Sequence, residues 1–256
     1  MPENTSSVAL ITGGNRGIGR GIALALADAG VGVVITYRRH ADEALELVSR
    51  ITDAGGVARA LQLDVSDAAS FPAFRADLTA ALGDAWGRAD LDFLVNNAGV
   101  SGDPSPLGDT TAENLDHLYA VHVKGVFLLT QELAPLLRDG GQVLAVSSGL
   151  TRFVSPPFSA YAAMKAATEV LVRYWAAELG GRGISVNTIA PGPVATDFGG
   201  GMDNLPSEVL ASFDSQAALG RIGQPADIGE FVASLLTSKS SWATAQRIEL
   251  SGGFSL

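Results

Sequence analysis

Residues 7–27 read SVALITGGNRGIGRGIALALA. The first five are an apolar run typical of a buried strand, and residues 22–27 are strong helix formers. Between them lies a glycine-rich turn, residues 12–19, in which Gly13 and Gly17 can take a positive φ or let a ligand approach the backbone. The free N–H groups of a helix that follows such a turn can bind phosphate. The stretch therefore predicts a dinucleotide-binding turn, although a turn built only for packing has the same pattern.

Further apolar runs of strand type alternate with helix-like stretches along the rest of the chain. They lie near residues 31–36, 57–63, 91–95, 142–147, 184–189 and 246–250. This alternation predicts an α/β, doubly wound (Rossmann) fold with a mostly seven-stranded parallel sheet and helices on both faces. The chain has 256 residues, is 47% hydrophobic and shows no linker, so we expect a single dinucleotide-binding and catalytic domain over residues 1–256.

The composition excludes several classes of function. A formal net charge of −10 argues against nucleic acid and anionic membranes as partners, because both require a basic surface. The first residues have neither a basic region nor a long apolar stretch, so we expect no membrane segment and a cytoplasmic protein. The chain has no cysteine and its three histidines are scattered, which predicts that no catalytic metal is bound.

A second motif can move a proton. Tyr161 and Lys165 lie four residues apart in a helix-favouring segment, residues 160–179, so both side chains project from one face. An ammonium near a phenol stabilises the phenolate, and we expect Lys165 to lower the pKa of Tyr161 toward neutrality. Ser148 follows the strand-like residues 142–147, where a hydroxyl can hydrogen-bond a substrate oxygen. Each motif alone is also compatible with an ordinary exposed position.

Together these motifs resemble the short-chain dehydrogenase/reductase family over nearly the whole chain and in the family's order. The resemblance is closest to 3-oxoacyl carrier-protein reductases and carbonyl reductases. It implies that Ser148 orients a carbonyl, that Tyr161 is the general acid or base, and that Lys165 tunes Tyr161 and holds the nicotinamide ribose. The following residues match the family's cofactor contacts: Gly13, Gly14, Asn15, Arg16, Gly17, Ile18, Gly19, Asp64, Val65, Asn97, Ala98, Gly99, Tyr161, Lys165, Pro191, Gly192, Val194 and Thr196.

One position departs from the family pattern. His122 stands where the family usually has a catalytic asparagine, whose main-chain carbonyl holds a water in a proton relay. Since a main-chain role survives substitution, we expect activity to persist with an altered pH profile. A hydrogen-bonded helix residue with no catalytic part is the alternative interpretation of His122.

The end of the second strand indicates which nicotinamide cofactor is used. Tyr37, Arg38 and Arg39 stand about where an NAD enzyme has an acidic residue against the ribose 2′-hydroxyl. Arg38 or Arg39, joined by Arg16, can instead pair with a 2′-phosphate. We therefore predict NADP(H), the alternative being that these arginines are a solvated strand end.

The resemblance also indicates where substrate binds. In the family the loop of residues 150–159 and the glycine-rich region of residues 197–206 shape the pocket, and here the loop contains Phe153 and Phe158. A modestly hydrophobic ketone is the expected substrate, reduced reversibly to a secondary alcohol. Oxidation of a sugar, polyol or steroid alcohol, and a non-catalytic NADP(H)-binding redox sensor, remain alternatives. We expect a homotetramer or homodimer, with the helix that carries Trp175 at an interface.

Overall fold

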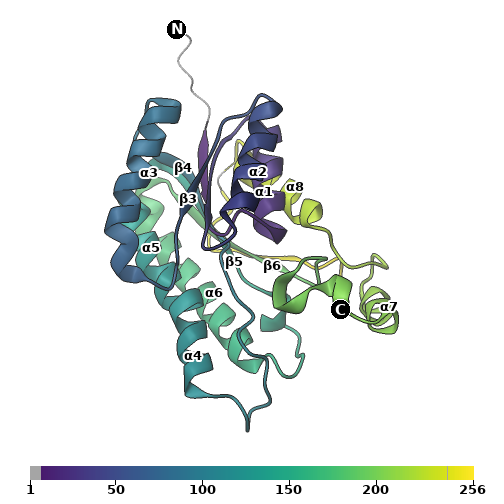
Figure 1. Ribbon diagram of the computed structural model, residues 1–256. Helices are drawn as coiled ribbons and strands as arrows, with labels where there is room; N and C mark the ends of the chain where they lie inside the picture. The colour runs from purple at the N-terminus through teal and green to yellow at the C-terminus, as the bar shows by residue number, and fades with distance from the viewer. Residues whose placement is uncertain (1–6, 241) are drawn as a thin grey trace.

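The computed structural model describes residues 7–240 and 242–256, and in these ranges seven parallel strands form one sheet (Figure 1). Their order is β3-β2-β1-β4-β5-β6-β7, so the chain reverses direction across the sheet between β1 and β4. The strands are β1 (Val8–Ile11), β2 (Gly32–Tyr37), β3 (Ala58–Gln62), β4 (Leu91–Asn96), β5 (Leu137–Val146), β6 (Ser185–Pro191) and β7 (Arg247–Leu250). The predicted doubly wound parallel sheet is confirmed.

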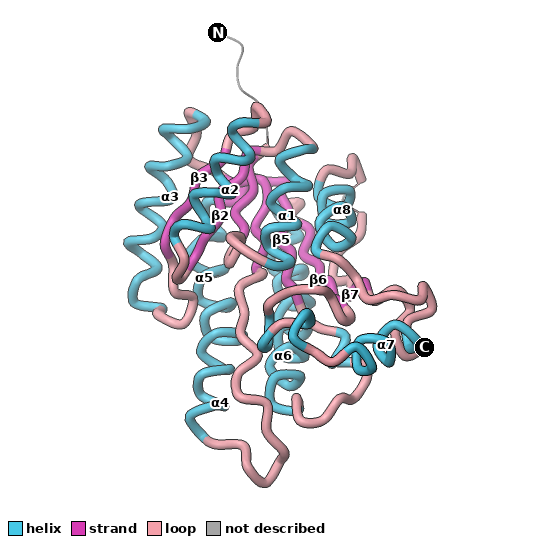
Figure 2. Tube along the Cα trace, turned by 45° about the vertical axis from the view of Figure 1, so that its right-hand side comes forward, coloured by secondary structure: helices cyan, strands magenta, loops and turns pink. Residues whose placement is uncertain are grey.

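Helices cover both faces of the sheet (Figure 2). They are α1 (Gly17–Asp28), α2 (Ala41–Asp53), α3 (Phe71–Trp86), α4 (Ala112–Tyr119), α5 (Val126–Leu133), α6 (Ser159–Leu179), α7 (Ser207–Gln216) and α8 (Pro225–Leu236). A π-helical segment, η2 (Ala120–Gly125), joins α4 to α5. None of these helices is long and apolar enough to span a lipid bilayer.

Two apolar cores result because successive residues of a strand point to opposite faces. In β1, Val8 and Leu10 belong to one core with apolar residues of α3, α5 and α6. Ala9 and Ile11 belong to the other core, with α1, α2 and α8. Every residue of β1 is therefore buried, which explains why this strand is apolar without alternation.

Two details differ from the sequence-based expectation. Strand β5 begins at Leu137, earlier than residue 142, because Leu137 pairs with Leu91 ahead of a register shift in the β4–β5 ladder. Trp175, expected at a subunit interface, is buried in the core of its own chain and packs against Phe127 with ring centroids 5.9 Å apart. The Trp175 ring therefore packs inside its own chain, whereas the neighbouring Tyr174 is exposed to solvent.

Candidate active site

The glycine turn and the strand β4 meet where the strand order reverses, which is where open α/β sheets bind ligands. Gly13 and Gly17 both have positive φ, 62° and 54°. A Cβ added to Gly13 would lie 3.0 Å from the Cα of Ala98, so only glycine lets the two segments approach this closely. Asn97 Nδ2 donates to the carbonyl oxygens of Thr12 and Gly13, at 2.8 and 3.0 Å.

This turn fits a dinucleotide phosphate. Helix α1 begins at Gly17, has no side-chain cap at Arg16 and has no acidic residue in its first turn. Its first N–H groups are therefore not capped by a side chain, and the positive end of the helix dipole lies at the cavity. The Gly13 N–H donates a hydrogen bond to Thr36 Oγ1 at 3.1 Å, a contact that was not predicted from the sequence.

The predicted 2′-phosphate residues are split between two environments. Arg38 and Arg39 line the cavity, and in the part of the chain that the structure describes neither forms an ion pair. Arg16 also lines the cavity, but its guanidinium is paired with Asp197 at 2.7 Å. Burial acts to raise the pKa of Asp64, but hydrogen bonds from Ser66, with the charge of Arg38, outweigh it and lower the pKa.

A cavity of about 750 Å³ brings together most of the predicted site residues. Of the predicted cofactor contacts, Gly14 and Tyr37 do not line it. Tyr37 packs against the core of α1, α2 and α8, because the alternation along β2 places it on the same face as Ile35 and leaves Thr36 to line the cavity. A Cβ on Gly14 would meet Ile35, so this glycine serves packing rather than the cavity.

Ser148, Tyr161 and Lys165 meet at the carboxyl end of β5, as predicted. Tyr161 and Lys165 are one turn apart on α6 and both are buried. Ser148 is hydrogen-bonded to the Tyr161 phenol, and its Oγ also accepts the Leu150 N–H at 3.2 Å. Lys165 Nζ donates to the Val146 carbonyl oxygen at 2.8 Å and lies 5.8 Å from the Tyr161 ring centroid.

The pKa values at this cluster are set by burial. Burial raises the pKa of Tyr161 above its ordinary value, and the hydrogen bond with Ser148 offsets this only in part. Burial also lowers the pKa of Lys165 to about 8. The net pKa of Tyr161 is therefore displaced away from neutrality, opposite to the expected direction, because the loss of solvation dominates.

His122 lies behind this cluster, outside the cavity lining. It is 1% exposed within η2, and its ring packs edge-on to Tyr161 with centroids 5.3 Å apart. Nε2 lies 2.7 Å from the Val100 carbonyl oxygen, which can only accept, so Nε2 carries the proton. Burial, with the charge of Lys165, lowers the pKa of His122 to about 3, so the imidazole is neutral and does not titrate near neutrality. The His122 carbonyl oxygen accepts the Thr168 hydroxyl at 3.0 Å.

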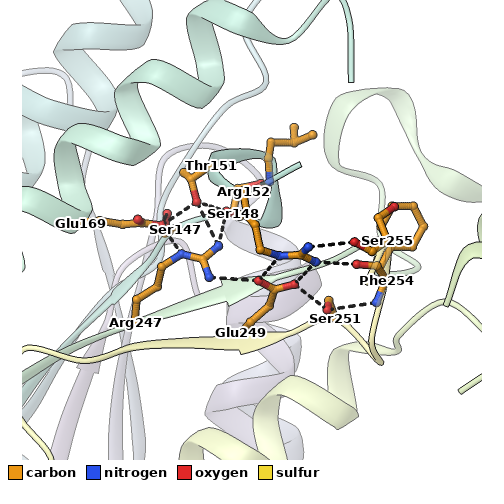
Figure 3. A network of polar contacts seen from close by, with 11 residues as sticks. Ser147, Ser148, Thr151, Arg152, Glu169, Arg247, Glu249, Ser251, Phe254 and Ser255 are labelled. Carbon is orange, nitrogen blue, oxygen red and sulfur yellow. Dashed lines mark hydrogen bonds and ion pairs between the residues drawn. The ribbon is translucent and has the colours of Figure 1, made fainter. Parts of the chain in front are cut away.

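A network of polar side chains surrounds the turn that carries Ser148 (Figure 3). Glu169 Oε1, on α6, accepts from Ser147 Oγ, Thr151 Oγ1 and Arg247 Nε, at 2.7, 2.8 and 2.9 Å. Arg247 Nη1 also donates to Glu249, which in turn pairs with Arg152. The network joins the helix of Tyr161 and Lys165 to the turn that carries Ser148. Sequence analysis did not identify it, because hydrogen-bonded partners such as Arg152 and Glu249 are 97 residues apart.

A family model described as enoyl-(acyl carrier protein) reductase matches residues 13–255. The NADPH-dependent aldehyde reductase-like protein, chloroplastic, of Arabidopsis thaliana is 35% identical, over 96% of this chain and 93% of its own.

Two solved structures are similar over nearly the whole chain. The promiscuous reductase LugOII, which catalyses keto-reduction at C1 during lugdunomycin biosynthesis, has a TM-score of 0.93 and 37% identity, covering 99% of this chain and 100% of its own. The angucycline C-6 ketoreductase LanV with bound NADP has a TM-score of 0.91 and 34% identity, covering 98% and 97%.

Proposed function

This chain belongs to the short-chain dehydrogenase/reductase family of oxidoreductases, and from that membership we propose that it reduces a ketone reversibly to a secondary alcohol with NADPH. The observation that carries the proposal is the hydrogen-bonded pair of Ser148 and Tyr161, which lines the same cavity as the glycine turn. Keto-reduction by LugOII and LanV supports this direction of the reaction.

In the proposed mechanism, Ser148 and Tyr161 bind the carbonyl oxygen of the ketone. When bound in the cavity, the nicotinamide supplies the hydride that adds to the carbonyl carbon. Tyr161 donates its proton to the oxygen, and its raised pKa keeps the phenol protonated at neutral pH, the form that reduction requires. Lys165, with a pKa of about 8, is mostly charged at pH 7 and stabilises the negative charge that develops on the Tyr161 oxygen.

The preference for NADPH rests on Arg38 and Arg39. Both line the cavity and neither forms an ion pair among the described residues, so their guanidinium groups are available to a 2′-phosphate. The bound NADP of LanV and the NADPH dependence in the name of the Arabidopsis relative support the same cofactor. Arg16 would join them only by exchanging its pair with Asp197.

Absorbance of NADPH during turnover of a ketone tests the cofactor and the chemistry together. We expect turnover with NADPH, little with NADH, and loss of at least about a hundredfold in kcat in Tyr161→Phe, which keeps the ring and removes the proton. Arg38→Asp combined with Arg39→Ser should move the ratio of kcat/KM values toward NADH. An unchanged ratio would exclude the role of the arginines, and full activity of Tyr161→Phe would exclude the mechanism.

The proposal also includes a homotetramer or homodimer, a cytoplasmic location and a single domain over residues 1–256, as expected from the sequence.

A further inference from the structure

Three segments form the part of the cavity beyond the cofactor residues: residues 149–158, 198–216 and 254–255. The lining side chains that the structure describes in these segments are apolar or uncharged, and they include Leu150, Phe153, Val209, Phe213 and Phe254. An anionic group placed here would lose its hydration without gaining a paired charge. This half of the cavity therefore favours an uncharged substrate.

Aromatic rings dominate one wall of this region. Phe254 packs against Phe153 with ring centroids 4.9 Å apart and against Phe213 at 6.0 Å. Phe198 contributes a further ring, 5.9 Å from that of Tyr161. Rings at these distances hold one another in defined orientations and offer faces and edges to another ring. We call Phe153, Phe213 and Phe254 the aromatic wall.

Arg152 lies beside the aromatic wall, and its guanidinium is bound by Glu249 and by two backbone carbonyl oxygens (Figure 3). Its Nε and Nη2 donate to the two oxygens of Glu249, at 2.7 and 2.5 Å. Nη1 and Nη2 donate to the carbonyl oxygens of Ser255 and Phe254, at 2.8 and 2.5 Å. The guanidinium therefore clamps the backbone of Phe254 in place and has no free charge to offer an anionic substrate.

Arg182 does not supply that charge either. It donates to Asp139 and to the carbonyl oxygens of Ala134 and Leu137, at the start of β5, whereas the cavity lies at the strand's other end.

We propose that this site takes an uncharged ketone that carries an aromatic ring, that this ring packs against the aromatic wall, and that Phe254, clamped by Arg152, is a specificity-determining residue. The inference rests on the proposed function, and it names the substrate class of that same site. The reacting carbonyl is bound by Ser148 and Tyr161, and the aromatic wall selects what is attached to it.

Two ketones that differ only by a fused benzene ring provide the first test. With NADPH, 2-tetralone should have a kcat/KM at least about tenfold above that of cyclohexanone, because burying a benzene ring in an apolar site is favourable. A 2-tetralone with a carboxylate on the benzene ring should be at least about tenfold poorer than 2-tetralone itself. Equal values for 2-tetralone and cyclohexanone, or a preference for the carboxylate, would overturn the inference.

Variants then test the two residues. Phe254→Leu should raise the KM for 2-tetralone about tenfold and lower the ratio of its kcat/KM to that of cyclohexanone, because leucine is still apolar but has no aromatic ring. Arg152→Met should do the same by releasing the backbone of Phe254. Phe231→Leu on α8 and Arg75→Met, which removes the pair with Glu132, are matched controls away from the cavity. An unchanged substrate ratio in both Phe254→Leu and Arg152→Met would contradict the assignment.

A binding measurement separates this inference from the proposed function. If no ketone is reduced, the proposed function fails. Calorimetric titration of 2-tetralone and cyclohexanone into the protein with NADP⁺ then decides the inference alone. Binding of 2-tetralone at least about tenfold tighter than cyclohexanone, lost in Phe254→Leu but not in Phe231→Leu, supports it. Equal affinities would overturn it.

Discussion

At the scale of single residues, burial rather than mutual contact controls protonation around Tyr161. The phenol, the ammonium of Lys165 and the imidazole of His122 are all removed from water. The pKa of each is therefore shifted in the direction that favours its neutral form. Tyr161 is thereby kept protonated and His122 neutral, so Lys165, with its pKa of about 8, is the member of the three that changes charge nearest to neutrality.

We predict that ketone reduction falls above about pH 8. Lys165 is charged below its folded-state pKa of about 8 and neutral above it, so kcat/KM should fall about tenfold per pH unit on the alkaline side. Lys165→Arg should be slower but should lose this decline up to pH 10, because a guanidinium stays protonated. The measurement is a pH–rate profile from pH 6 to 10. The same decline in Lys165→Arg would show that another group is responsible.

At the scale of elements, α6 and the turn after β5 must be held in register for Ser148 to meet Tyr161. Glu169 is two turns along α6 from Tyr161, and it receives hydroxyls from both sides of Ser148, at Ser147 and Thr151. The side chain of Glu169 is 13% exposed, so its hydrogen bonds are little screened by water. We infer that Glu169 is a positioning residue for Ser148.

We predict that Glu169→Ala lowers kcat about tenfold with little change in the KM for NADPH, because it releases the hydroxyls of Ser147 and Thr151 beside Ser148 and leaves Arg247 with Glu249 as its remaining ion pair. Glu169→Gln should restore part of the loss, since its amide oxygen can still accept. Glu46→Ala, which breaks the exposed pair with Arg20, is the control and should have little effect. Steady-state kinetics with thermal melting check this. If Glu169→Ala has a lower thermal stability but an unchanged kcat, Glu169 has a structural role and does not position Ser148.

At the scale of the whole molecule, α1 and α8 pack with their backbones in close contact on one face of the sheet. A Cβ on Gly21 would overlap the carbonyl group of Pro225, and one on Gly229 would overlap Gly21. Helix α1 carries the glycine turn at its start, so this packing also determines where its N-terminus lies relative to the sheet.

We predict that Gly21→Ala lowers the free energy of unfolding by about 1–3 kcal/mol, because the added methyl group forces α1 and α8 apart. Gly83→Ala in the interior of α3 is the matched control. A Cβ there meets no atom within 4 Å, so this change should stabilise by about 0.5–1 kcal/mol. Both are measured by thermal melting. Equal effects of the two substitutions would contradict the packing argument.

Local pattern explains why so much was predictable. The glycine turn, the seven strand-like runs and the helix of Tyr161 and Lys165 are each encoded within about twenty consecutive residues. Parallel strands place their carboxyl ends at one edge, which is where the sequence placed Ser148, and the family resemblance placed Asn97 with the glycine turn at the same site. Tyr37 was predicted to contact the cofactor, but its side chain does not line the cavity, because alternation along a buried strand decides which side chains point there.

By itself the sequence determined the fold class, the family resemblance and the residues nearest to the proposed chemistry, because these depend on local periodicity and on motifs of fixed spacing. Only the tertiary structure decided the protonation states of Tyr161, Lys165 and His122, since burial is a property of the packed chain. It alone also paired Arg16 with Asp197, joined Glu169 to Arg247 and clamped Phe254 with Arg152. These partners are separated by 78 to 181 residues, and no local pattern determines which distant charges meet.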